Sequence, residues 1–116
     1  MGIIVDLKTT EDASPEAFAK SIARYGYHRQ NSMYVDGVES STGDFVKGFV
    51  FVVTEKTPPY CTAVYQLDMQ GVELGRDQYK RLLLDLADCK IKNAWPGYSN
   101  RIETISMPRW AMKEVA

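Results

Sequence analysis

The chain begins with a short hydrophobic run that gives way to alternating polar and apolar positions, Ile3 to Lys8. This pattern predicts a strand that starts buried and ends at a polar edge or cleft. Residues 14–16 are Ser-Pro-Glu, which is typical of a helix start with Ser as the N-cap and Pro at the first helical position. The apolar residues that follow recur at helical spacing: Phe18, Ile22 and Tyr25. We therefore expect a helix that ends at Gly26.

A second helix is predicted from about Tyr27 to Ser40, and Thr-Gly-Asp at residues 42–44 ends it. Residues three or four apart form one stripe of this helix: Tyr27, Gln30, Tyr34 and Val38. The next segment, Phe45 to Thr54, is rich in Val and Phe and predicts a strong strand.

Lys-Thr-Pro-Pro at residues 56–59 predicts a turn, and Tyr60 to Leu67 alternates as the returning strand of a hairpin. Gln70-Gly71 is expected to end that strand. A long helix is predicted from about Glu73 to Lys90. Its expected inward-facing residues are Tyr79, Leu82, Leu83, Leu86 and Cys89.

The tail contains two aromatic-proline segments, residues 95–98 and 107–110, around a short predicted strand from Ile102 to Ser106. The predicted order is therefore β-α-α-β-β-α-β in one domain, residues 1–116. A strand, a helical crossover and a second strand form a right-handed parallel pair, and the hairpin adds an antiparallel strand. The fold class is α/β (α+β), a mixed sheet flanked by helices, and we expect an open sheet edge beside Ile3 to Lys8.

Composition narrows the function only slightly. The counts of 14 basic and 15 acidic residues argue against a surface that is basic throughout, but they leave room for a local basic groove. Cys61 and Cys89 lie far apart and form no C-x-x-C motif, so we expect two free thiols in a reducing compartment. We expect no signal peptide, because Met1 to Lys8 has no apolar run of the needed length, and the longest apolar run, Gly48 to Val53, is too short to span a membrane. A soluble cytoplasmic protein that does not contact membranes is the expectation.

The strongest candidate for chemistry is Asp6-Leu7-Lys8. Side chains on a strand repeat every two residues, so Asp6 and Lys8 project from one face. Asp6 and the backbone carbonyl of Leu7 can bind Mg²⁺, while Lys8 can orient a water or stabilise charge on a phosphate. The alternative is an ion pair on an edge strand. Asp88-Cys89-Lys90 is a second D-x-K triplet, but at a helix end residues two apart do not share a face.

Two further groups can contact DNA. Gln30 and Tyr34 are four residues apart on one helix, so an amide and a phenol can both hydrogen-bond a phosphate or a base. A packed helix stripe is the alternative. Basic and aromatic residues also cluster nearby: Lys20, Arg24, Tyr25, Tyr27, His28 and Arg29. Such a cluster suits a DNA backbone, although a solvated helix face explains it equally well, with His28 as a surface residue.

Taken together, these motifs resemble the nuclease domain of the RecE-type exonuclease VIII family, in the PD-(D/E)XK superfamily that also holds lambda exonuclease and the RecB nuclease domain. The D-x-K strand is followed some twenty residues later by Gln30-x-x-x-Tyr34, the order that this branch has. The tail is similar too, at residues 86–89, Trp95-Pro96 and residues 108–111. The resemblance covers nearly the whole chain.

The resemblance implies a truncated restriction-endonuclease-like core and Mg²⁺-dependent digestion of double-stranded DNA ends from the 5′ side, with Mn²⁺ as a possible substitute. Asp6 would be a metal ligand, Lys8 the catalytic lysine, and Gln30 and Tyr34 part of the family's third motif. Members of the family form oligomeric rings and work with a single-strand annealing recombination protein, so a homo-oligomer and such a partner are expected.

One feature departs from the family pattern. The family places another metal-binding Asp on the strand before D-x-K and a His or Glu on a helix before that, and only five residues precede Asp6 here. A single carboxylate binds Mg²⁺ poorly. We therefore expect a fragment, a prophage remnant or a chain completed by a partner. The alternatives to an active exonuclease are an inactive DNA-binding or assembly remnant, and a small interaction domain unrelated to DNA.

Overall fold

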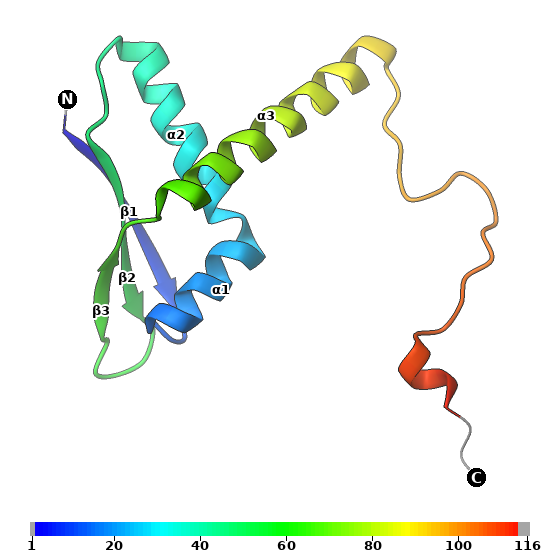
Figure 1. Cartoon of the computed structure of the whole chain (residues 1–116), viewed down its shortest axis with the longest axis horizontal. Coiled ribbons are helices and arrows are strands. Elements are labelled where there is room, and N and C mark those ends of the chain that lie inside the picture. The colour runs from blue at the N-terminus through cyan, green and yellow to red at the C-terminus, as the bar shows by residue number, and fades with distance from the viewer. Residues whose placement is uncertain (1, 114–116) are drawn as a thin grey trace. The chain divides into compact units, whose positions relative to one another are not determined.

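In the computed structural model, which describes residues 2–113, three strands form one sheet with the order β1-β2-β3 (Figure 1). The strands are β1 (Ile3–Thr10), β2 (Gly48–Glu55) and β3 (Thr62–Tyr65). β1 pairs with β2 in parallel, Ile3 opposite Gly48, and β2 pairs with β3 antiparallel. The predicted parallel pair and antiparallel hairpin are confirmed, and the fold is a mixed α+β arrangement as expected.

Two helices connect the parallel strands, α1 (Pro15–Tyr25) and α2 (Tyr27–Thr42). Ser14 caps α1 as predicted, because its side chain accepts a hydrogen bond from the Ala17 N–H. Gly26 separates the two helices with φ 72°, a left-handed conformation that glycine adopts without strain, and its N–H closes α1 on the Ile22 carbonyl. The tight turn at Gly26 directs α2 back across the sheet.

The third helix, α3 (Met69–Lys92), follows the sheet, and a short 3₁₀ helix, η1 (Arg109–Met112), lies near the C-terminus. The chain divides into two units, Met1–Asp85 and Leu86–Ala116, and α3 contributes residues to both. Within residues 2–113 no helix is long and apolar enough to cross a membrane.

The core lies between the sheet and the helices that cover one of its faces (Figure 1). Its central side chains are aromatic: Phe18 of α1 contacts Phe51 edge-to-face at 5.4 Å and stacks with Tyr65 of β3 at 5.5 Å between ring centroids. Strand alternation places Ile4, Asp6 and Lys8 on this covered face, since they are opposite the core residues of β2. The other face of the sheet carries exposed apolar side chains: Ile3, Val5, Leu7 and Val64.

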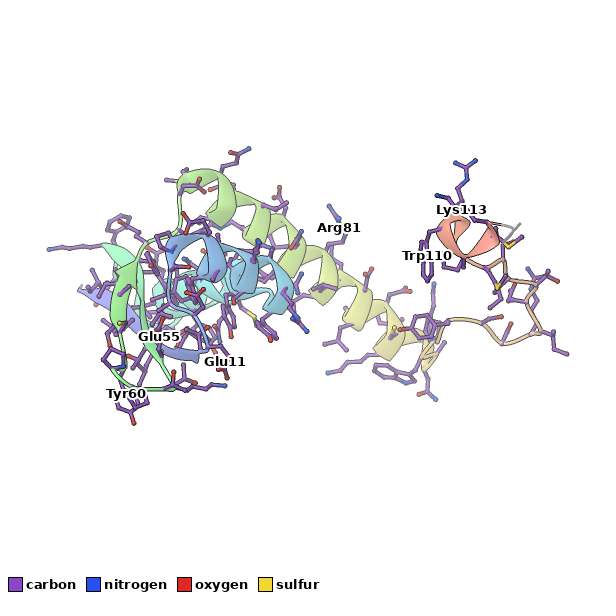
Figure 2. All side chains as sticks on the ribbon, turned by 90° about the horizontal axis from the view of Figure 1, so that it is seen from below. Glu11, Glu55, Tyr60, Arg81, Trp110 and Lys113 are labelled. Atoms are coloured by element: carbon purple, nitrogen blue, oxygen red, sulfur yellow. The ribbon has the colours of Figure 1, made fainter. Side chains whose placement is uncertain are left out.

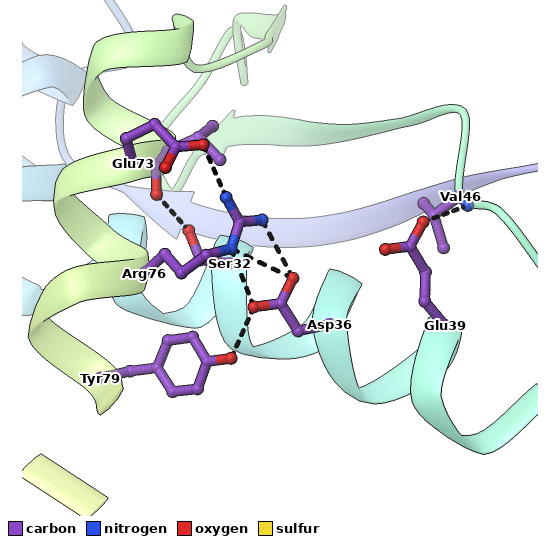
Figure 3. A network of polar contacts seen from close by, with 8 residues as sticks. Ser32, Asp36, Glu39, Val46, Glu73, Arg76 and Tyr79 are labelled. Carbon is purple, nitrogen blue, oxygen red and sulfur yellow. Dashed lines mark hydrogen bonds and ion pairs between the residues drawn. The ribbon is translucent and has the colours of Figure 1, made fainter. Parts of the chain in front are cut away.

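Polar side chains join α2 to α3. His28, Ser32 and Asp36 lie four residues apart and all reach α3, where they contact Gln78, the carbonyl of Val72 and Arg76, respectively. Asp36 accepts a bidentate hydrogen bond from Arg76 and another from the Tyr79 hydroxyl, while Arg76 also pairs with Glu73 (Figure 3). In the same view, the Glu39 carboxylate of α2 accepts from the Val46 N–H, which fixes the loop before β2. Hydrogen bonds and ion pairs therefore hold α2 and α3 together.

A glycine makes this close approach possible. Gly75 is buried in α3, and a Cβ there would collide with the backbone carbonyl of His28. His28 is consequently 8% exposed, with Nε2 at 2.6 Å from Gln78 Oε1. The interpretation of His28 as a surface residue is therefore wrong, because α3 covers it.

The structure corrects two predictions about α3. The helix begins four residues earlier than expected, at Met69, because Asp68 accepts a hydrogen bond from the Gly71 N–H and so caps it. Gln70-Gly71 therefore lies in a helix and ends no strand. Most of the residues expected to face inward are exposed: Leu82, Leu83 and Leu86. The distal part of α3, where Arg81 projects from the helix in Figure 2, has exposed residues on nearly every position.

The predicted strand from Ile102 to Ser106 is not formed, since these residues have no regular structure and no strand partner within residues 2–113. Its apolar positions, Ile102 and Ile105, are exposed, so the alternating pattern has no sheet to join. Trp110 of η1 is exposed as well (Figure 2).

The outer edge of β1 has no strand partner in the described part of the chain, as expected. The carbonyls of Gly2 and Thr10 accept hydrogen bonds from Lys47 and Lys56, on the β2 side. Successive carbonyls point to opposite sides of a strand, so the even-numbered ones face β2 and that of Leu7 faces the unpaired edge. Pairing of this edge with another chain stays a prediction.

Replacing Gly75 by Ala should destabilise the protein by about 1–3 kcal/mol, because the new methyl group collides with the His28 carbonyl. Gly37→Ala in α2 is the matched control, since a Cβ there meets nothing within 4 Å and should stabilise the helix by about 0.5–1 kcal/mol. Urea denaturation followed by circular dichroism measures both. Equal effects of the two variants would contradict the close packing of α2 on α3.

The pKa of Asp36 lies below its ordinary value of 3.8, chiefly because Arg76 hydrogen-bonds to the ionised carboxylate. A depressed folded-state pKa stabilises the fold above pH 3.8, and this stabilisation disappears as pH falls through the folded-state pKa. Asp36→Asn should therefore lower the free energy of unfolding by about 1 kcal/mol at pH 7, and the difference from wild type should shrink below pH 3.8.

Urea titrations at several pH values test this expectation. Asp88→Asn is the control, because Asp88 forms only an exposed ion pair with Lys92 and its loss should have little effect. A difference between Asp36→Asn and wild type that is independent of pH would rule out the ionised carboxylate as its source.

Candidate functional site

Asp6 and Lys8 lie side by side on the helix-covered face of β1, two residues apart as the strand repeat requires. Lys8 Nζ is 2.9 Å from Asp6 Oδ2, and the side chains are only 14% and 20% exposed. The ion pair lacks the alignment of a hydrogen bond, so the buried Oδ2 atom of Asp6 has no hydrogen-bond partner within residues 2–113. An oxygen that is buried and incompletely satisfied is available to a further donor or cation.

The helix α2 completes the surroundings of Lys8. Lys8 Nζ donates a hydrogen bond of 2.6 Å to Gln30 Oε1 and lies 4.2 Å from the centre of the Tyr27 ring. Gln30 in turn donates from Nε2 to the Tyr34 hydroxyl at 3.0 Å. The structure therefore brings together the four residues Asp6, Lys8, Gln30 and Tyr34, in a continuous chain of polar contacts from strand to helix.

Tyr27 is the neighbour of Lys8 that the sequence did not identify. The sequence places Tyr27 in one helix stripe with Gln30, Tyr34 and Val38 and in a basic-aromatic cluster, without a role at Lys8. The available signal is its spacing, because Tyr27 and Gln30 are three residues apart and so share a helix face. A cation above a tyrosine ring is attracted to its π-electrons, and the contact fixes the ammonium group in place.

Two groups of the described residues could contribute to a metal site, the Asp6 carboxylate and the Leu7 carbonyl. The carboxylate of Asp6 is the kind of hard oxygen ligand that Mg²⁺ prefers, and its Oδ2 atom is paired with Lys8 but accepts no hydrogen bond from residues 2–113. The Leu7 carbonyl faces the unpaired strand edge, so it is open to a ligand. Within residues 2–113, however, no three His, Cys, Asp or Glu side chains gather closely enough to hold a metal. Mg²⁺ tolerates one or two carboxylates when water fills the remaining positions.

The four basic residues predicted to contact DNA differ in accessibility. Lys20 and Arg24 are exposed on α1, four residues apart and hence on one stripe. His28 and Arg29 both contact Gln78 Oε1 of α3, and neither is exposed. The structure therefore leaves Lys20 and Arg24 open to a ligand and engages the other two in helix packing.

The second D-x-K triplet has a different setting. Asp88 lies in the last turns of α3, where it pairs with Lys92 at 3.2 Å, four residues along the helix. Both partners are more than half exposed. This pair is solvated, unlike Asp6 and Lys8, as the helical spacing predicts.

Comparison with known proteins agrees with this geometry. No curated protein matches the chain. A family model described as PDDEXK-like matches the chain, which supports membership of the PD-(D/E)XK superfamily. The mixed α+β core, with Asp6-Leu7-Lys8 on a strand, is compatible with this match. The family described as a PDDEXK-like domain of unknown function, DUF3799, matches residues 1–108, and the chain therefore belongs to this family.

Proposed function

We propose that this chain carries the lysine-bearing part of a Mg²⁺-dependent nuclease site, which hydrolyses phosphodiester bonds of double-stranded DNA from the 5′ end in the manner of RecE-type exonucleases. Mn²⁺ would substitute for Mg²⁺. The proposal rests on the contacts of the Lys8 ammonium group. It forms an ion pair with the Asp6 carboxylate, donates a hydrogen bond to the Gln30 amide and lies over the Tyr27 ring.

The nuclease superfamily supports this choice over other uses of an acid-lysine pair, because the family is PDDEXK-like. The contacts of Lys8 compensate a charge that is largely covered by the helices, and they also hold the ammonium group in one position. Three contacts fix the position of the ammonium group, and positioned charge is what stabilises a phosphate as negative charge develops on it.

Each residue has a distinct part in the proposed reaction. Asp6, with the Leu7 carbonyl, would hold the metal ion, which when bound supplies polarisation of the phosphate and a lowered pKa of its water. Lys8 orients the attacking water or stabilises the charge on the phosphate oxygens. Gln30 positions Lys8, and the Tyr34 hydroxyl, which accepts from Gln30, keeps its own proton to donate to a phosphate oxygen.

DNA would approach over the exposed basic residues of α1. Lys20 and Arg24 are accessible and supply the charges that attract a phosphate backbone. A homo-oligomer and a single-strand annealing partner remain predictions from the resemblance.

A second candidate is a DNA-binding or assembly module that has kept the fold without the chemistry. The observation in its favour is the ligand count: within the described residues one carboxylate stands beside Lys8, and no group of three metal-ligating side chains forms. In this alternative, Asp6 and Lys8 serve only as an ion pair, and duplex DNA is bound but not cut.

We predict that the isolated chain with Mg²⁺ degrades linear duplex DNA far more slowly than a family member that has a second metal-binding carboxylate, or not at all. The reason is that a single carboxylate leaves the metal weakly held. Any remaining activity should disappear in Asp6→Ala and Lys8→Ala, by at least about a hundredfold. The assay follows release of label from a 5′-labelled duplex with Mg²⁺ or Mn²⁺.

Asp88→Ala and Lys90→Ala are the matched controls, because they alter the solvated D-x-K triplet and should leave the rate unchanged. Robust digestion by the isolated chain would contradict the single-carboxylate argument. Digestion that persists unchanged in both Asp6→Ala and Lys8→Ala would remove these residues from the reaction. Binding without cleavage under every metal condition would favour the second candidate.

A further inference from the structure

A cavity of about 370 Å³ lies at the carboxyl end of β1, next to the Lys8 site. Its lining comes from β1, the loop after it, α1, the start of α2 and the turn after β2, and it includes Glu11, Asp12, Tyr25, Tyr27 and Lys56. The cavity and the Lys8 site have Tyr27 in common, because its ring lines the cavity and its centre lies 4.2 Å from Lys8 Nζ. The Lys8 ammonium group and the cavity are therefore neighbours that share the Tyr27 ring.

The wall formed by Tyr25 is suited to an aromatic ligand. Tyr25 is 59% exposed although it stacks on Tyr27 at 5.7 Å between ring centroids, so one side of the aromatic pair remains accessible. Arg24 Cζ lies over the Tyr25 ring, 5.5 Å from its centre, so a base that stacks on this ring would also contact or displace the guanidinium group. An exposed ring with a neighbouring cation is the arrangement on which single-stranded nucleic acid bases stack.

The charges at the cavity disfavour a phosphate and favour a base. Glu11 is exposed at the rim, 3.8 Å from Lys56, and offsets the charge of that lysine. The Asp12 carboxylate, whose pKa is lowered by the hydrogen bond from the Ser14 N–H, is also negative there. Carboxylate and hydroxyl groups accept hydrogen bonds from the amino groups of bases and repel phosphate oxygens.

We propose that this cavity receives one unpaired nucleobase at the end of a DNA strand, stacked on Tyr25, while the phosphate next to that base lies at Lys8. The proposal rests on the proposed nuclease function and adds to it a separation of the terminal base from the duplex. The volume lies near the lower end of the range for ligand pockets, about 300–1,000 Å³, and so suits one base and not a base pair.

The test measures binding of the full chain to DNA in EDTA, so that no cleavage occurs. One duplex ends in an unpaired 2-aminopurine nucleotide, and a matched duplex ends in an abasic residue. The wild-type chain should quench 2-aminopurine fluorescence and bind the base-bearing DNA more tightly. Tyr25→Ala should abolish the quenching and weaken binding of the base-bearing DNA about tenfold, the size expected for one lost base-aromatic stack. Its binding of the abasic DNA should be unchanged.

Tyr25→Phe is the matched control, because it keeps the ring and should keep both the quenching and the affinity. Circular dichroism shows whether each variant folds, and the exposed position of Tyr25 makes both substitutions compatible with the core. The proposed base pocket is wrong if the wild-type chain binds the two duplexes equally without quenching, or if Tyr25→Ala weakens binding of both duplexes equally. Either result would still show that the chain binds DNA. If wild type binds neither duplex, both the pocket and the proposed nuclease function fail.

Discussion

The ammonium group of Lys8 lies under the helices, where a charge is costly unless other groups compensate it. Asp6 supplies the opposite charge, Gln30 a hydrogen-bond acceptor and Tyr27 an aromatic face. The last two come from α2, so the turn at Gly26 must send that helix back across the sheet. The same geometry that makes the charge tolerable also fixes its position, and a fixed cation beside a carboxylate is what phosphodiester chemistry uses.

The packing of α3 supports this arrangement from the other side of α2. Gly75 lets the two helices approach, and the Asp36–Arg76 ion pair fastens them farther along. His28 and Arg29 both contact Gln78 of α3, and they are therefore not part of an exposed basic surface. Lys20 and Arg24 of α1 remain exposed. In our proposal, therefore, α1 and not α2 supplies the charges that attract DNA.

Much of the fold could be predicted from sequence because local signals and strand periodicity act over short distances. Ser14 and Gly26 mark helix ends, and alternation placed Asp6 and Lys8 on one face. The contacts of α2 with α3 could not be predicted, because His28, Ser32 and Asp36 form a polar stripe that resembles a solvent face. Of the residues of α3 expected to face inward, Tyr79 does contact α2 through Asp36, but the leucines are exposed in the described chain, and Gly75 and polar neighbours make most of the contact. Likewise, the spacing of Gln30 and Tyr34 indicated a shared face, but the hydrogen bond from Lys8 to Gln30 depends on how α2 crosses the sheet.

In our proposal, Asp6 and the adjoining Leu7 carbonyl hold a divalent cation next to Lys8. Titration of the nitrogen-15-labelled chain with Mn²⁺, followed by nuclear magnetic resonance, tests it directly, because the paramagnetic ion broadens the amide signals nearest to it. We expect the amides of residues 6–8 to broaden first, and Asp6→Asn to prevent this. Broadening that centres instead on Glu11 and Asp12, or that is unchanged in Asp6→Asn, would contradict the account.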